Sequence, residues 1–159
     1  MIIQEADLFK ELSPEIRKEI SEIMVEETYP PGSSVFKAGD PADSFYLIVD
    51  GRVILTVGTE GQIDYTASVP GEAFGWTGMV DRPTYVATAE CLTPCKLVKI
   101  EKTRLDRILK KDLGSGMIFF KRLAAAVVQR LIDNYGMFLS EGYLKGVSYG
   151  TGQVLGSEE

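Results

Sequence analysis

The segment from Pro70 to Glu90, PGEAFGWTGMVDRPTYVATAE, contains the residue types best suited to bind a ligand. It begins with a glycine turn and continues through an aromatic–glycine pair into a run of small residues. Backbone N–H groups around Trp76, Thr77 and Gly78, at the start of a short helix, would bind an anion weakly. Trp76 and Tyr85, however, occupy two positions where a charged side chain would bind an anion best. The segment therefore predicts a loop that encloses an anion but has aromatic residues at its centre.

The rest of the composition argues against catalytic and metal chemistry. The chain of 159 residues has no histidine, which removes the commonest general base and the commonest transition-metal ligand. Its two cysteines, Cys91 and Cys95, cannot complete a four-ligand zinc or iron–sulfur site by themselves. With no nucleophile elbow and no cluster of metal ligands, we predict no catalytic residues, no metal and no cofactor.

Cys91 and Cys95 flank a turn at Leu92-Thr93-Pro94. We interpret them as small, partly buried apolar residues at a hairpin, in the reduced state. A redox switch through a Cys91–Cys95 bridge is the alternative.

Charge and hydropathy limit the possible partners and the location. The net charge of −6 argues against a broad surface for nucleic-acid phosphates. No apolar run approaches the roughly 20 residues that span a bilayer. The acidic start, MIIQEADLFKEL, lacks the basic flank of a signal peptide. We therefore expect a cytoplasmic protein without membrane contact.

The N-terminal part predicts one amphipathic helix, LSPEIRKEISEIM. Ser13 is a suitable N-cap and Pro14 suits the first helical position. Ile16, Ile20 and Ile23 form one apolar stripe.

From Tyr29 the pattern changes to short β-rich runs between turns. The predicted turns include Pro31-Gly32, Asp50-Gly51 and Gly58–Gly61. Asp50-Gly51 between two apolar runs favours a hairpin. The runs are Val35–Phe36, Phe45–Val49, Val53–Val57, Gln62–Val69, Thr84–Glu90 and Cys95–Ile100. Many short strands at this spacing predict a sandwich, roll or barrel.

The C-terminal part is helical again. A short helix over Glu101–Asp112 is expected to end at Gly114–Gly116, and a long helix follows over Met117–Leu139. Its first half is apolar on two sides, so a second surface must cover it, either a neighbouring helix or a partner chain. We predict a homodimer through Phe120, Ala124, Val127 and Leu131. Residues 1–139 form the predicted domain, and the glycine-rich residues 140–159 are expected to be flexible.

Two motifs give this arrangement a family resemblance. VFKAGDPADSFYLIVDG, followed by FGWTGMVDRPTYVATA, resembles the two signatures of the cyclic nucleotide-binding domain family, and LFKELSPEIRKEI is similar to its N-terminal helix. This family includes the sensor modules of catabolite-activator-type transcription factors and the regulatory subunits of kinases. The resemblance implies an antiparallel β-roll of jelly-roll type with an N-terminal helix and two C-terminal helices.

The resemblance also implies that the second signature is a phosphate-binding cassette. In the family a glutamate after a glycine binds the ribose hydroxyl, and an arginine binds the cyclic phosphate. Aligning Gly75 with the family glycine puts Trp76 at the glutamate and Tyr85 at the arginine. The spacing is retained, while both polar contacts are replaced by aromatic residues.

Three functions remain open from the sequence. The chain could sense another small ligand, anionic or aromatic; dimerise or dock on a partner with its pocket filled by its own tryptophan; or bind cyclic nucleotide through Arg82 and backbone amides. Glu72 is the other candidate for replacing a lost polar contact. Candidate ligand-binding residues are Phe74, Gly75, Trp76, Thr77, Gly78, Arg82, Tyr85, Val86 and Ala87. We expect no DNA-binding domain in these residues, since only about twenty follow the long helix; the chain could be a fragment of a larger regulator.

Overall fold

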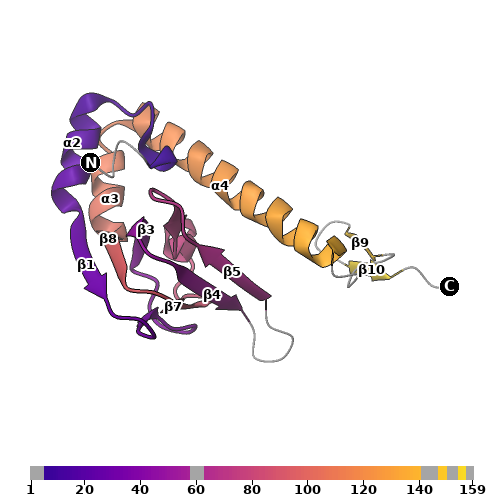
Figure 1. The fold of residues 1–159 in the computed structure, drawn as a ribbon. Coiled ribbons are helices and arrows are strands. Elements are labelled where there is room, and N and C mark those ends of the chain that lie inside the picture. The colour runs from indigo at the N-terminus through magenta and orange to yellow at the C-terminus, as the bar shows by residue number, and fades with distance from the viewer. Residues whose placement is uncertain (1–5, 58–62, 141–146, 150–153, 157–159) are drawn as a thin grey trace. The chain divides into compact units, whose positions relative to one another are not determined.

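All the described strands pair antiparallel, and the described part of the chain comprises residues 6–57, 63–140, 147–149 and 154–156 of a computed structural model (Figure 1). The chain divides into two units, Met1–Arg122 and Leu123–Glu159, and each is considered by itself. The first unit contains an N-terminal helix, two sheets and the beginning of the C-terminal helical part. This confirms the predicted class, mainly β-structure with an N-terminal helix and C-terminal helices.

Two four-stranded sheets form the first unit. One has the order β1-β8-β3-β6, with β1 at Val25–Tyr29, β8 at Cys95–Glu101, β3 at Ser44–Asp50 and β6 at Ala73–Phe74. The other has the order β2-β7-β4-β5, with β2 at Ser34–Phe36, β7 at Thr88–Cys91, β4 at Val53–Val57 and β5 at Ile63–Ala67. Buried side chains from both sheets, such as Ile48 and Val53, form one apolar cluster.

The hairpin predicted at Asp50-Gly51 is wrong, because β3 and β4 belong to different sheets. Gly51 has a φ of +97°, and a Cβ atom there would lie 2.4 Å from the carbonyl oxygen of Pro94. The glycine therefore allows a close approach between two connections as the chain passes from one sheet to the other. The same correction applies at Cys91 and Cys95, because β7 and β8 also lie in different sheets.

Helix α2, Pro14–Ile23, confirms the predicted N-terminal helix. The Ser13 hydroxyl accepts a hydrogen bond from the Ile16 backbone N–H at 3.3 Å, as an N-cap does. Ile16, Ile20 and Ile23 are all buried.

The predicted helix break at Gly114–Gly116 is wrong. Helix α3 covers Lys102–Leu109, and α4 already begins at Leu113 and continues to Ser140. The Asp112 carboxylate accepts hydrogen bonds from the Ser115 N–H at 3.2 Å and the Ser115 hydroxyl at 2.9 Å, and these bonds hold its pKa below the usual value. A Cβ atom at Gly116 would lie 3.2 Å from the Leu109 carbonyl oxygen, so this glycine lets α4 start close to α3.

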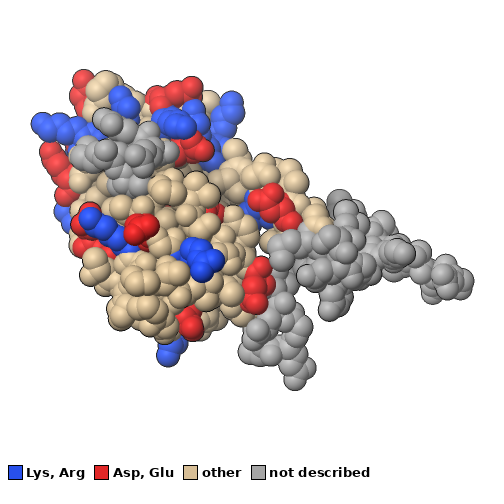
Figure 2. All heavy atoms as spheres, viewed as in Figure 1, with Lys and Arg blue, Asp and Glu red and all other residues tan. Residues whose placement is uncertain are grey.

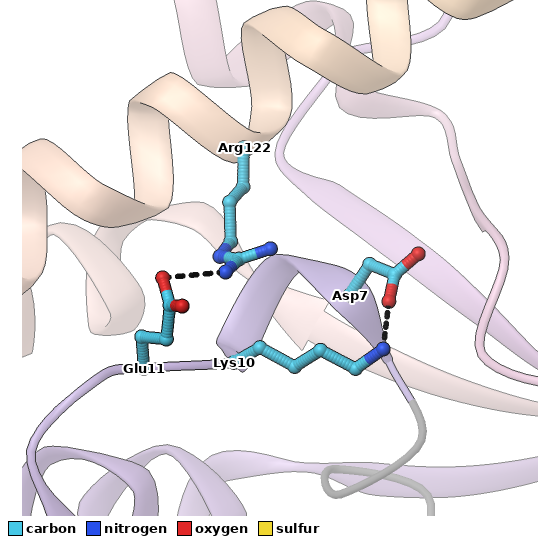
Figure 3. A network of polar contacts seen from close by, with 4 residues as sticks. All are labelled: Asp7, Lys10, Glu11 and Arg122. Atoms are coloured by element: carbon cyan, nitrogen blue, oxygen red, sulfur yellow. Dashed lines mark hydrogen bonds and ion pairs between the residues drawn. The ribbon is translucent and has the colours of Figure 1, made fainter.

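The N-terminal residues bind the first turns of α4 (Figure 3). Arg122 of α4 forms an ion pair with Glu11 at 2.6 Å. The Phe9 ring, at the end of the 3-10 helix η1 (Asp7–Phe9), stacks on Phe119 with the ring centroids 5.9 Å apart. The N-terminal segment and α4 are thus joined by both apolar and polar contacts within the first unit.

In the second unit two short strands, β9 (Val147–Tyr149) and β10 (Val154–Gly156), pair antiparallel. They lie inside the segment expected to be flexible, and its flexibility stays a prediction. The turn predicted at Gly58–Gly61 falls outside the described residues.

Acidic and basic side chains are intermixed on the face of the molecule drawn in Figure 2, where no broad basic area is visible. Within the described ranges, none of the helices is both long enough and apolar enough to cross a membrane.

Candidate functional site

The cassette loop begins with a left-handed glycine and a short helix. Gly75 has a φ of +74°, and a Cβ atom there would lie 2.8 Å from the Phe36 ring. The 3-10 helix η2, Trp76–Val80, follows at once, as the sequence predicted for its first residues. At Gly78 a Cβ atom would lie 1.9 Å from the Ala42 carbonyl oxygen, so η2 packs directly against the backbone before β3. Both glycines are therefore required by close contacts.

The second half of the loop is hydrogen-bonded to the segment before β3. The Tyr85 N–H donates to the Asp40 carbonyl at 2.9 Å, and the Gly39 N–H donates to the Tyr85 carbonyl at 2.9 Å. The Ala42 N–H donates to the Pro83 carbonyl at 3.0 Å. These bonds fix the backbone on both sides of the Tyr85 side chain.

Tyr85 points into the core. Its side chain is only 4% exposed, and its ring stacks on Phe36 with centroids 3.8 Å apart and an interplanar angle of 13°. Its hydroxyl donates a hydrogen bond to the Ser44 carbonyl. Burial raises the pKa of this phenol to about 12. The side chain that the resemblance aligns with the family arginine is thus neutral, buried and hydrogen-bonded within the chain.

Tyr85 belongs to a cluster of four aromatic rings. Phe36 lies 5.8 Å from Tyr46 and 6.1 Å from Phe74 between ring centroids, and Tyr46 stacks on Phe74 at 5.5 Å. All four rings are buried, which makes them part of the apolar core between the sheets.

The other candidate residues are distributed between core and surface. Phe74 and Gly75 lie beside the Phe36 ring together with Tyr85. Trp76, Thr77 and Ala87 are half-buried, Gly78 is buried, and Arg82 and Val86 are exposed. The loop thus brings three candidates together in the core and leaves Arg82 at its surface.

The Glu72 carboxylate accepts hydrogen bonds within a turn. The donors are the Tyr65 hydroxyl at 2.5 Å, the Ser68 N–H at 3.0 Å and the Val69 N–H at 3.2 Å. These bonds close the connection between β5 and β6, which argues against Glu72 as a substitute for a ribose-binding carboxylate.

The partners of Tyr85 were not predicted from the sequence. Phe36, on which its ring stacks, and the Ser44 carbonyl, which accepts its hydrogen bond, both come from the first motif. The available signal was the apolar pair Val35-Phe36, since an aromatic residue in each motif can stack once the motifs meet.

A groove of about 410 Å³ between η2, α3 and the start of α4 was not predicted from the sequence either. The groove is lined by Met79, Asp81, Asp106, Leu109, Lys110, Leu113, Gly116, Met117 and Phe120. Asp81 forms an ion pair with Lys102 at 2.8 Å, which holds the pKa of this carboxyl below its usual value.

Both cysteines are buried, whereas partial burial was expected. The Cys95 thiol donates weakly to the carbonyls of Arg52 and Thr93, each at 3.3 Å. Burial, and then the neighbouring Cys95, raise the pKa of the Cys91 thiol to about 12. In the described ranges no group of three or more His, Cys, Asp or Glu side chains could hold a metal ion.

Comparison with known proteins agrees with this geometry. The profile of the cyclic nucleotide-binding domain family matches residues 26–112. A cAMP-dependent protein kinase regulatory subunit from Colletotrichum orbiculare is 27% identical over 107 residues, which cover 67% of this chain and 27% of that protein. The chain thus spans about a quarter of the length of this curated relative.

Solved structures show the same fold. A predicted cyclic nucleotide-binding protein from Geobacter metallireducens has a TM-score of 0.72 and 29% identity, covering 81% of this chain and 95% of that chain. The sensor domain of the transcriptional regulator DNR from Pseudomonas aeruginosa has a TM-score of 0.68 and 26% identity, covering 82% and 94%. The family profile spans more than half of the sequence and the fold is shared along most of it, so this chain belongs to the cyclic nucleotide-binding domain family.

Proposed function

We propose that this chain is a non-enzymatic regulatory module that does not bind cAMP or cGMP in the manner of its family. The observation that carries the proposal is the position of Tyr85. Its ring is stacked in the core and its hydroxyl is bonded to Ser44, so it offers no charge and no free donor to a phosphate.

Two contacts that the family makes to its nucleotide are lost in this chain. A phosphodiester anion in a pocket needs a paired charge or several donors, and arginine supplies a planar, two-pronged contact that tyrosine cannot. Trp76 likewise replaces the carboxylate that would bind the ribose. Two contacts of about 1.5 kcal/mol each correspond to about a hundredfold loss of affinity.

The aromatic cluster favours partner docking over sensing of a small ligand by the cassette. A ligand in the family position would have to displace Tyr85 from its stack with Phe36 and break its hydrogen bond. The alternatives are a small anionic or aromatic ligand held by Trp76 and the η2 amides, or a cyclic nucleotide held by Arg82.

Titration with nucleotides tests the proposal. Trp76 is the only tryptophan, so its fluorescence reports on the cassette directly. We expect no change with cAMP or cGMP up to millimolar concentration, and no heat in calorimetry. Saturable binding at micromolar concentration would overturn the proposal and would direct attention to Arg82.

A double variant, Trp76→Glu with Tyr85→Arg, provides the reverse test. If the cassette backbone is otherwise intact, the variant should gain measurable affinity for a cyclic nucleotide. If it folds but gains none, the small-ligand alternative loses its pocket and partner docking is favoured further.

We also propose that the module is a homodimer through α4. Leu113, Met117, Phe120, Ala124, Val127 and Leu131 recur at alternating spacings of four and three residues. This is the spacing of a two-helix seam. All six are exposed in the single chain, Val127 by 41% and Leu131 by 46%, so the stripe is available to a second copy.

A further inference from the structure

Two highly exposed apolar side chains line the groove between η2, α3 and the start of α4. Leu113 is 77% exposed and Met117 is 72% exposed, more than any other large apolar residue that the structure describes. Met79 and Leu109 line the same groove as buried side chains. All the lining residues belong to the first unit, so one chain forms the groove by itself. Exposed apolar side chains around a groove are typical of a surface that binds another molecule.

The form of the groove suits a helix better than a small molecule. Its volume of about 410 Å³ has room for a few apolar side chains, and the exposure of Leu113 and Met117 leaves it open to solvent. Two of the lining residues are methionines, whose unbranched side chains adapt to the shape of a partner. An amphipathic helix fills such a groove with the apolar side chains of one face.

The carboxylates that line the groove are matched by lysines. Asp81 forms an ion pair with Lys102 at 2.8 Å. Asp106 and Lys110 are four residues apart on the same side of α3, the spacing at which opposite charges on a helix attract each other. The lining itself therefore carries no excess of negative charge.

The residues beside the groove add positive charge. Arg107 directly follows Asp106, Lys121 directly follows Phe120, and both cations are exposed. Neither forms an ion pair with a residue that the structure describes. Residues 101–122 contain seven Lys and Arg but three Asp and Glu, in a chain whose net charge is −6. The surroundings of the groove are thus positive in a molecule that is otherwise acidic.

We infer that this groove binds an acidic amphipathic helix of a partner protein. The apolar face of that helix packs on Leu113, Met117 and Phe120, and its carboxylates pair with Arg107 and Lys121. A basic helix would bring like charges together at Arg107 and Lys121, which opposes binding. This inference rests on the partner docking of the proposed function and names its surface and the chemistry of the partner.

The groove shares Leu113, Met117 and Phe120 with the proposed homodimer seam. A partner helix therefore competes with the second copy for the first part of α4. Val127 and Leu131 belong to the seam but do not line the groove. Binding at the groove should thus be at least as tight in a chain that cannot dimerise.

A synthetic peptide tests the groove directly. The probe is a fluorescein-labelled peptide of about 15 residues, the length at which an isolated helix begins to form in water. It has leucine at every third or fourth position and glutamate or alanine elsewhere. In fluorescence anisotropy it should bind the Val127→Glu chain saturably and the unmodified chain no more tightly. Its affinity should fall as salt is raised, because the charges lie at an exposed surface.

A second peptide, with lysine in place of each glutamate, tests the charge of the partner. It should bind at least about tenfold more weakly than the acidic peptide. Tighter binding of the basic peptide would overturn the inference. So would the absence of saturable binding of the acidic peptide to the Val127→Glu chain.

Two variants with matched controls locate the binding. Arg107→Glu should weaken it about fivefold, as expected for an exposed charge pair. Arg104→Glu makes the same change of charge on the other side of α3, two residues before Asp106, and should leave the affinity nearly unchanged. Met117→Ala should weaken binding about tenfold through lost apolar contact, whereas Leu92→Ala, exposed in the β7–β8 connection, should not.

Arg107 and Met117 are both exposed, so these two variants should fold like the unmodified chain. If neither substitution weakens the binding, the peptide binds elsewhere and the inference is wrong.

The nucleotide titration separates this inference from the proposal beneath it. Saturable binding of cAMP or cGMP at micromolar concentration would remove the proposed function, whatever the peptide does. No response to either nucleotide, together with no binding of the acidic peptide, would keep the proposed function and remove this groove as the docking surface.

Discussion

Tyr85 should contribute to folding stability as a core residue. Tyr85→Phe removes the hydroxyl and leaves the buried Ser44 carbonyl without its donor, which should cost about 1–2 kcal/mol. Tyr85→Ala also removes the ring from its 3.8 Å stack on Phe36 and leaves a cavity between the sheets. By analogy with other aromatic truncations this should cost about 3–5 kcal/mol. At this chain length, each kcal/mol lowers the melting temperature by about 2–4 °C.

Urea unfolding followed by Trp76 fluorescence measures these differences. Val86→Ala is the matched control, because Val86 is the next residue and is 49% exposed; it should change stability by less than about 0.5 kcal/mol. If Tyr85→Ala folds and loses less than about 1 kcal/mol of unfolding free energy, Tyr85 is not a core residue, since a side chain facing an open ligand site would behave in that way. A large loss of stability for Tyr85→Ala with none for Tyr85→Phe would show that the ring stacking stabilises the fold and the hydrogen bond to Ser44 does not.

Three other perturbations test separate parts of the structure. Val127→Glu would bury a charge at the proposed seam, so sedimentation at tens of micromolar should show monomers where the unmodified chain shows dimers. Cys91 should resist alkylation at pH 8–9 in the folded chain and react after unfolding; because folding raises its pKa from 9.0 to about 12, its contribution to the free energy of unfolding should be complete below pH 9 and be lost as the pH rises toward 12. Rapid labelling of the folded chain would contradict this. Gly78→Ala should destabilise by about 1–3 kcal/mol, because its Cβ atom would lie 1.9 Å from the Ala42 carbonyl oxygen. Gly136→Ala, with nothing within 4 Å, should stabilise by about 1 kcal/mol, and equal effects of the two substitutions would refute the packing argument.

Much of the local structure was encoded in short stretches of sequence. The Ser13 cap with Pro14 and the isoleucine stripe specified α2, because capping and amphipathicity act within a few turns. The run Val53–Val57 is β4 with the same bounds. The spacing from Gly75 to Tyr85 led to the prediction of a cassette that lacks two polar groups, and this stays a prediction.

Sheet membership could not be read from the same patterns. Asp50-Gly51 and Leu92-Thr93-Pro94 were correctly recognised as turns, but each connects strands of different sheets. A turn motif fixes only a few backbone angles, whereas the choice of pairing partner depends on which long-range arrangement buries both apolar faces. The helix break predicted at Gly116 was wrong for a related reason. Gly116 is needed because a Cβ atom there would lie close to the Leu109 carbonyl oxygen. The sequence alone does not distinguish this packing role of a glycine from its tendency to end a helix.

The same division applies to the candidate site. The sequence predicts that Tyr85 stands at the position of the family arginine, and hence that the ordinary phosphate contact is absent. Only the tertiary structure decided where the ring goes, because Phe36 and the Ser44 carbonyl come from a distant part of the chain and meet Tyr85 only when the two sheets pack. The side chain is directed inward because its stacking partner and its hydrogen-bond acceptor both lie there.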